Sequence, residues 1–321
     1  MSVDSPVEST STASHSSGSN PGEQEGAARG ETGGVAASRG EIPVTIIQPQ
    51  NGWVPIDFRE LWQHRELLFF LVWRDIKVRY KQSELGVAWV LIQPLLSTGI
   101  FAVLFRLLLG AGNEPTAGEV PYFLSTFCAM LPWQLFSESL TRSGNSVVKN
   151  RNMIQKIYFP RIMLPLSSTI GCLADFAIAF GALMLMMVFY GVMPGFAVLT
   201  LPFFVGLAVM ASLAVGLWLS ALAAIYRDFL YVQPFVIRIG MFVSPVVYTV
   251  ASLEGKLPSW ALVLYGLNPM AGVIEGFRWA LLGSGGLSPL IVIPSTIVTL
   301  AAFLSGVMYF GRMEERVVDV C

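Results

Sequence analysis

The stretch that most limits the possible fold covers residues 196–225, because none of its thirty side chains is charged. A helix needs about 20 apolar residues to cross the hydrocarbon core of a bilayer. In lipid every backbone N–H and C=O must find a partner within the protein, and at this length only a helix provides those partners. Residues 196–225 therefore predict a transmembrane helix.

Five more stretches have a similar length and apolar character. Over the whole chain 54% of the residues are hydrophobic and 13% are charged, whereas soluble domains carry about 25% charged residues. The sequence shows no inverted repeat of the kind found in many secondary transporters. We expect an all-α membrane protein whose six-span domain occupies residues 86–311. The predicted transmembrane helices cover 86–109, 121–140, 164–191, 196–225, 229–250 and 287–311.

Between the fifth and sixth spans lie two apolar stretches that are too short to cross a bilayer. They cover residues 260–267 and 270–282, and Asn268 and Pro269 separate them. We expect two short re-entrant helices that dip into the membrane and return. A pair of helices lying flat on the membrane surface is the alternative.

Two segments precede the first span. Residues 1–42 are mostly Ser, Thr, Gly, Glu and Ala, which bury too little apolar surface to offset the entropy of ordering, so we expect a disordered polar tail. Residues 43–85 predict an amphipathic helix, started by Asp57 and Glu60 in a capping box and lying in the membrane interface. Packing on a soluble domain is the alternative. The expected apolar stripe consists of Phe58, Leu61, Trp62, Leu68, Phe69, Val72, Ile76 and Tyr80.

Lys and Arg residues are distributed unevenly between the predicted loops. Loops 111–120 and 191–195 contain none, whereas 143–161 and the segment before the first span contain many. Cytoplasmic loops carry the excess of positive charge, so the second group of loops is expected in the cytoplasm. Both termini, including the short C-terminal segment 312–321, are then cytoplasmic.

The predicted cytoplasmic loop 143–161 mixes basic and apolar residues. Topology requires the positive charges but does not explain the exposed hydrophobic residues, so we expect this loop to dock a cytosolic partner. A loop that only fixes topology is the alternative. The mixed residues include Lys149, Arg151, Met153, Ile154, Lys156 and Tyr158.

Charged residues inside predicted spans are costly in lipid and therefore suggest function. Asp175 lies about ten residues into the third span, roughly 15 Å deep. It could serve a proton relay, or form an ion pair or hydrogen bond between helices, which we favour. Glu138 lies near the inner end of the second span at a different expected depth, which argues against a catalytic acid pair with Asp175.

Several classes of site find no support in the sequence. No G-x-x-x-x-G-K-[ST] motif occurs, so a P-loop that cradles nucleotide phosphates would have to belong to another chain. Two histidines (His15 and His64) and three scattered cysteines have no metal-site or disulfide spacing. We expect no metal, no bound cofactor and no catalytic site.

Residues 74–95, RDIKVRYKQSELGVAWVLIQPL, resemble the start of the permeases that export polysaccharides and polyol phosphates, a type-2 branch of the ABC transporters. These membrane subunits export O-antigen, capsule or teichoic-acid chains. The resemblance covers about residues 44–320. It continues through PWQLFSESL (132–140), NRNMIQKIYFPRIMLPLSS (150–168), YRDF (226–229), SPVVY (244–248), NPM with EGFR (268–278) and FGRMEERVVDV (310–320).

The resemblance implies a homodimer in the cell inner membrane, bound to two ATPase subunits that hold the ATP. A lipid-linked glycan would pass through a channel at the dimer axis, and no nucleic acid would be bound. Residues 149–161 would be the coupling helix, and the two short helices after residue 250 would form a periplasmic gate. The cytoplasmic gate would contain Arg74, Lys77, Arg79, Tyr80 and Lys81. The channel lining would include Trp89, Gln93, Phe235 and Phe242.

Three other functions remain open. A type-2 ABC permease could move a drug or a small lipid, and a proton-coupled secondary carrier could use Asp175. A membrane glycosyl- or acyltransferase would need acidic or histidine clusters in its loops, and the loops here offer little beyond Arg227 and Asp228.

Overall fold

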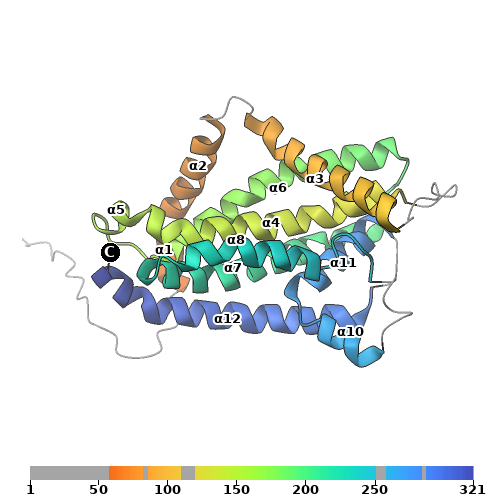
Figure 1. Ribbon diagram of the computed structural model, residues 1–321. Coiled ribbons are helices and arrows are strands. Elements are labelled where there is room, and N and C mark those ends of the chain that lie inside the picture. Colours follow the sequence, from red (N-terminus) through yellow and green to blue (C-terminus); the bar gives the residue numbers. More distant parts are fainter. Residues whose placement is uncertain (1–57, 82–85, 110–119, 251–257, 284–286, 321) are drawn as a thin grey trace, which may run out of the picture. The chain divides into compact units, whose positions relative to one another are not determined.

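The computed structural model describes residues 58–81, 86–109, 120–250, 258–283 and 287–320, and all regular structure in these ranges is helical (Figure 1). The expected tail 1–42 lies outside the described residues. The helices are α1 Phe58–Gln63, α2 Arg65–Lys81, α3 Gly86–Leu109, α4 Tyr122–Lys149, α5 Arg151–Ile154, α6 Met163–Phe189, the 3-10 turn η1 Phe196–Thr200, α7 Leu201–Ile225, α8 Phe229–Val243, α10 Ser259–Tyr265, α11 Pro269–Leu282 and α12 Pro289–Val320.

The predicted all-α fold is confirmed for the described residues. Three segments are long and apolar enough to cross a membrane, namely Met163–Phe189, Phe196–Ile225 and Pro289–Met313. Two shorter apolar helices cover Ala88–Leu104 and Phe229–Val243. The total of six spans stays a prediction.

Three predicted helix ends are wrong. Helix α12 runs to Val320, nine residues beyond the predicted end of the sixth span at residue 311. Helix α4 runs to Lys149, nine residues beyond the predicted end of the second span at residue 140. Helix α8 ends at Val243 rather than near residue 250. Ser244 adopts an extended conformation because the residue before a proline avoids helical geometry, and Pro245 has no N–H to continue the helical hydrogen bonds.

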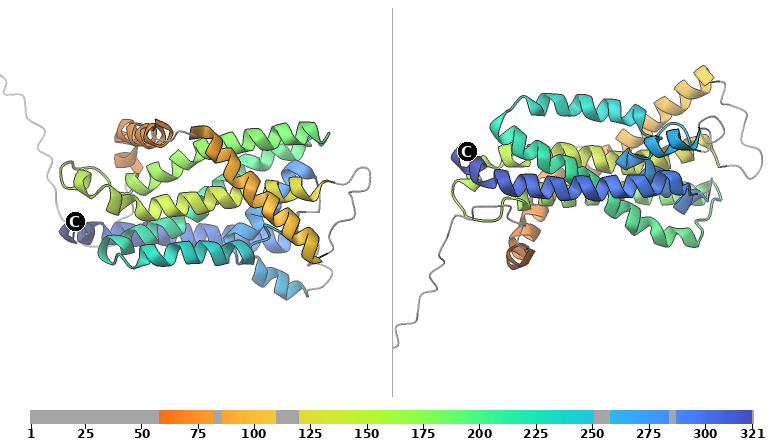
Figure 2. Two further views of the ribbon diagram at one scale, coloured as in Figure 1. Left: turned by 45° about the horizontal axis from the view of Figure 1, so that its top comes forward. Right: turned by 90° about the horizontal axis from the view of Figure 1, so that it is seen from below.

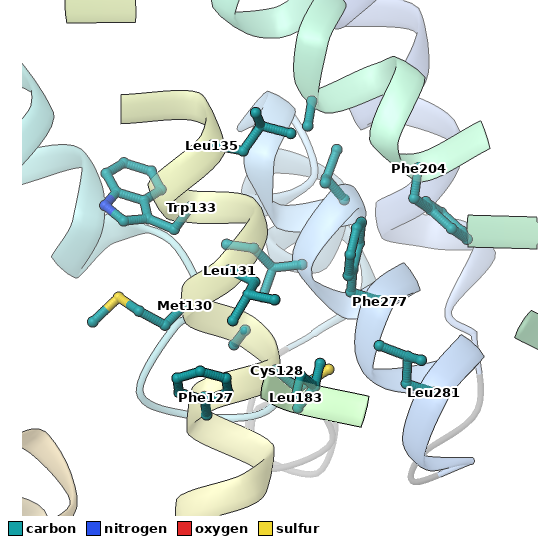
Figure 3. Packing of buried hydrophobic residues seen from close by; sticks show 14 of the residues in the cluster. Phe127, Cys128, Met130, Leu131, Trp133, Leu135, Leu183, Phe204, Phe277 and Leu281 are labelled. Carbon is teal, nitrogen blue, oxygen red and sulfur yellow. The ribbon is translucent and has the colours of Figure 1, made fainter. Parts of the chain in front are cut away.

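The largest core joins α4, α6, α7 and α11. Phe127 and Leu131 of α4 belong to one buried cluster with Leu183 of α6, Phe204 of α7 and Phe277 of α11 (Figure 3). Almost every residue of α11 is buried, because α4, α7 and α12 all contact it. Re-entry of α10 and α11 into the bilayer stays a prediction.

The expected single amphipathic helix before the first span is wrong in two respects. It breaks at His64 into α1 and α2, and its apolar residues lie on two faces instead of one stripe. Leu71 is fully buried and Leu68 packs beside it against the start of α6. The exposed aromatic residues are Trp62, Phe69, Phe70 and Trp73. Helix α6 covers the leucine side, and the aromatic side is exposed. The location of this side in a membrane interface stays a prediction.

Helices α7 and α12 approach closely at Gly306. A Cβ atom at this position would lie 2.6 Å from the backbone oxygen of Ala214, and small residues allow such close helix contacts in membranes. We expect Gly306→Ala to destabilise the protein by about 1–3 kcal/mol through overpacking, measured as a lower Tm of the purified chain. Gly206→Ala on α7 is the control, because nothing lies within 4 Å of the added Cβ and alanine favours a helix. Equal melting temperatures for the two variants would contradict the prediction.

Candidate functional site

A cavity with a mostly apolar wall and several charged side chains lies where α2, α3, α4 and α6 meet. Its volume is about 150 Å³, and both α2 and α3 contact α6 beside it (Figure 2). The polar lining residues are Arg79, Tyr80, Gln93, Gln134, Glu138, Arg142 and Asp175; Trp89, Val90, Leu131, Leu135, Cys172, Phe176 and Ala179 complete the lining. A cavity that combines apolar surface with charged and amide side chains can contact both the C–H faces and the hydroxyl groups of a solute.

Asp175 of α6 is the centre of a charged network in this cavity. Arg79 of α2 forms an ion pair with it, and the Tyr80 hydroxyl donates a hydrogen bond to it at 2.5 Å. Arg142 of α4 lies 3.7 Å from the same carboxylate. This geometry agrees with the ion-pair interpretation of Asp175. It also joins α2 to α6, two helices far apart in the sequence.

Arg142 connects a second carboxylate to the network. Its Nε atom lies 3.1 Å from Glu138, one helical turn earlier on α4. Glu138 and Asp175 therefore line the same cavity, and the expectation that they lie at different depths is wrong. The physical reason is the length of α4: because the helix continues to Lys149, Glu138 lies within it rather than near its end.

Tyr80 acts as a hydrogen-bond donor in this network. Burial and the hydrogen bond to Asp175 raise the pKa of Tyr80 to about 12. Its hydroxyl therefore keeps its proton at neutral pH and donates to the carboxylate.

The predicted gate residues divide into two groups. Arg79 and Tyr80 line the cavity, whereas Lys77 and Lys81 are exposed. Arg74 has a different role, because its Nη2 atom donates to Asn150 at 3.0 Å at the start of α5. Its Nη1 atom lies 3.8 Å from the sulfur of Met153.

The predicted coupling residues also divide. Met153 and Ile154 pack against a cluster that contains Leu71 of α2 and Phe159, and Arg151 is half-buried. Lys149 and Lys156 are exposed, and Tyr158 is 71% exposed. The segment thus has one side on the bundle and another that is open to a partner.

The structure brings only part of the predicted channel lining to the cavity. Trp89 and Gln93 of α3 line it, whereas Phe235 and Phe242 lie on the exposed side of α8. Phe242 touches α3 by an edge-to-face contact with Phe101, at 6.3 Å between ring centres. Neither phenylalanine lines the cavity.

Gln134 and Arg142 are the polar lining residues that the sequence analysis does not identify. With Glu138 they are spaced by four residues along α4, and residues four apart share one face of a helix. That spacing is the signal that could have identified them. Among the described residues, no group of three or more His, Cys, Asp or Glu side chains could hold a metal ion.

Comparisons with known proteins agree with a transport function. Residues 66–282 match the family described as ABC-2 type transporter. The chain is similar to an O-antigen export system permease protein RfbA from Myxococcus xanthus, with 28% identity over 220 residues, which cover 68% of this chain and 82% of that protein. Two proteins of that name from Klebsiella pneumoniae are 28% identical over 215 residues, covering 66% of this chain and 79% of theirs, and 26% identical over 261 residues, covering 79% and 95%.

Proposed function

Because the chain belongs to the ABC-2 type transporter family, we propose that it is the permease subunit of an ATP-driven exporter of lipid-linked polysaccharide. The cargo would be a glycan of O-antigen type that moves from the cytoplasm to the periplasm. The names of three relatives point to this class of cargo. The transport role and the multi-pass membrane location follow from the family and from the long apolar helices.

The cavity between α2, α3, α4 and α6 is the observation that carries the proposal. Trp89 lines it and is half-exposed, so its ring can stack on the C–H face of a sugar. Gln93 and Gln134 line the same space, and their amides both donate and accept hydrogen bonds, as sugar hydroxyls do. The contacts of Arg79 and Tyr80 with Asp175 join α2 to α6 at this cavity. In this proposal the glycan would enter beside α2.

The proposed assembly contains a second copy of the permease and an ATPase. Two copies of the permease would form a channel in the cell inner membrane, with six spans and cytoplasmic termini in each copy. An ATP-binding cassette ATPase would bind and hydrolyse the ATP, so this chain would need no cofactor of its own. The exposed residues Lys149, Lys156 and Tyr158 are the proposed docking surface, and α10 with α11 would form the outer gate.

Reconstitution in vesicles tests the proposal. We expect the chain to co-purify with an ATPase partner and to move a lipid-linked polysaccharide across the membrane only when ATP is supplied. We expect Trp89→Ala to lower the rate of glycan movement severalfold because the stacking surface is lost, while ATPase binding stays unchanged. Trp62→Ala is the matched control, since Trp62 is exposed and does not line the cavity.

The same vesicle experiment distinguishes the exporter from a drug or lipid permease and from a proton-coupled carrier. ATP-dependent movement of a drug or a small lipid, but of no glycan, would replace the proposed cargo. Transport that needs a proton gradient and no ATPase would replace the exporter with a carrier.

A further inference from the structure

The chain unwinds inside the bundle directly after α8. Residues 244–248, the sequence SPVVY, follow the end of the helix at Val243. Ser244, Pro245, Val246 and Val247 are buried. Irregular backbone at membrane depth is tolerated only where the protein itself satisfies its polar groups or lines a water-filled cavity. The hydrogen-bond donors to this segment therefore identify the residues that keep it in its unwound conformation.

All five backbone carbonyls of residues 244–248 have a donor. The Ser244 carbonyl accepts from the N–H of Val246 at 2.7 Å within the segment, and the Val247 carbonyl accepts from the Tyr122 hydroxyl of α4 at 2.8 Å. The other three carbonyls share one donor residue, Arg278 of α11. The guanidinium donates to Pro245 at 2.7 Å, to Tyr248 at 2.8 Å and to Val246 at 2.7 Å.

Arg278 is almost fully buried, with 2% of its surface exposed. Glu275, one turn earlier on α11, lies 3.5 Å from its Nη1 atom and balances its charge. Arginine suits this position because its planar fork carries several donors in fixed directions. A lysine ammonium is a compact point charge and could not reach all three carbonyls in this arrangement.

Two further contacts connect the same segment to α10 and α11. Asn268, the N-cap of α11, donates to the Ser244 hydroxyl at 2.9 Å. The Tyr248 and Tyr265 hydroxyls lie 2.8 Å apart, and Tyr265 is the last residue of α10. The end of α8 is therefore joined to both short helices.

We propose that Arg278 is a positioning residue for transport, because it fastens the unwound end of α8 to α11. Helix α8 and the pair α10–α11 then move as one unit, so movement of the two short helices is coupled to movement of α8. The transport part of this inference rests on the proposed exporter function. The local part, that Arg278 holds residues 244–248 in place, does not.

Hydrogen–deuterium exchange of the full-length chain in lipid nanodiscs tests the local part. Each hydrogen bond from a charged donor contributes about 1.5–3 kcal/mol, which corresponds to tenfold or more in a local opening equilibrium. We expect amides in residues 244–250 to exchange at least about tenfold faster in Arg278→Gln. Arg278→Lys keeps the charge beside Glu275 and should give a smaller increase.

Tyr122→Phe is the matched comparison, because it removes one carbonyl donor instead of the guanidinium that serves three. Its effect on residues 244–250 should be smaller than that of Arg278→Gln, and α6 should exchange as in the wild type in all variants. Unchanged exchange at 244–250 in Arg278→Gln would overturn the inference. Faster exchange in every helix of Arg278→Lys would also overturn it, since Arg278 would then be a general stabilising residue.

The ratio of glycan moved to ATP hydrolysed tests the transport part. We expect this ratio to fall about tenfold in Arg278→Gln while the ATPase activity of the complex stays near the wild-type value. An unchanged ratio would overturn the coupling role. If the wild-type chain moves no glycan, the exporter proposal fails, and the exchange experiment still decides whether Arg278 holds the segment.

Discussion

Replacing Asp175 with asparagine is expected to loosen α2 from α6. The carboxylate pairs with Arg79 and lies 3.7 Å from Arg142, and each member of the Asp175–Arg79 pair is only 16% exposed. Removing one partner of a partly buried ion pair leaves the other charge with less compensation. We expect a loss of about 2–4 kcal/mol in the free energy of unfolding, seen as a Tm lower by about 5 °C or more, together with reduced export.

The double variant Arg79→Gln/Asp175→Asn separates the two interpretations of Asp175. It removes both charges of the pair, while Arg142 keeps Glu138 as a partner. If Asp175 forms a structural ion pair, the double variant should recover much of the Tm and of the export lost in the single variant. A proton carrier would stay inactive in both variants, and that result would contradict our prediction.

Reversing the charge of Lys156 is expected to have the second large effect. Lys156 is exposed beside Ile157 and Tyr158, which are 55% and 71% exposed, on a segment whose Met153 and Ile154 pack against the bundle. A charge reversal at a docking surface costs affinity for the partner. We expect Lys156→Glu to bring export near the background level and to lower ATPase recovery at least about tenfold, while membrane insertion stays normal.

Arg227→Glu is the control for this reversal. Arg227 is exposed and lies in a predicted cytoplasmic loop outside the proposed docking surface. Its reversal should leave ATPase recovery close to that of the wild type. Normal export by Lys156→Glu together with its ATPase would show that the segment does not dock the partner.

Local sequence patterns were sufficient where a helix depends mainly on its own residues. The prediction of a helix over residues 86–109 is confirmed by α3, which covers Gly86–Leu109. Pro245, a helix-breaking residue, lies inside an apolar run that continues to residue 250. Hydropathy measures the free energy of transfer into lipid, whereas the end of a helix depends on backbone hydrogen bonds. The apolar run therefore continues to residue 250 although the helix ends at Val243.

The cavity required tertiary contacts that periodicity cannot supply. Arg79 and Asp175 were singled out separately, but their pairing joins residues 96 positions apart. Helix α2 has apolar residues on two faces, and tertiary contacts decide which face is buried. The leucine face is buried because it packs against α6. The hydrogen bonds of Arg278 depend on which backbone carbonyls after α8 point toward its guanidinium. No sequence pattern specifies that arrangement.

The two contacts of α2 have a mechanical consequence. Arg74 fastens the helix to Asn150, and Arg79 fastens it to Asp175, about 7.5 Å further along its axis at the helical rise. A rod fixed at two points on different neighbours resists spinning about its long axis, because a spin would pull both arginines from their partners. In the proposed exporter, a push on α5 from the ATPase would therefore tilt α2 like a lever with Asp175 as its fulcrum.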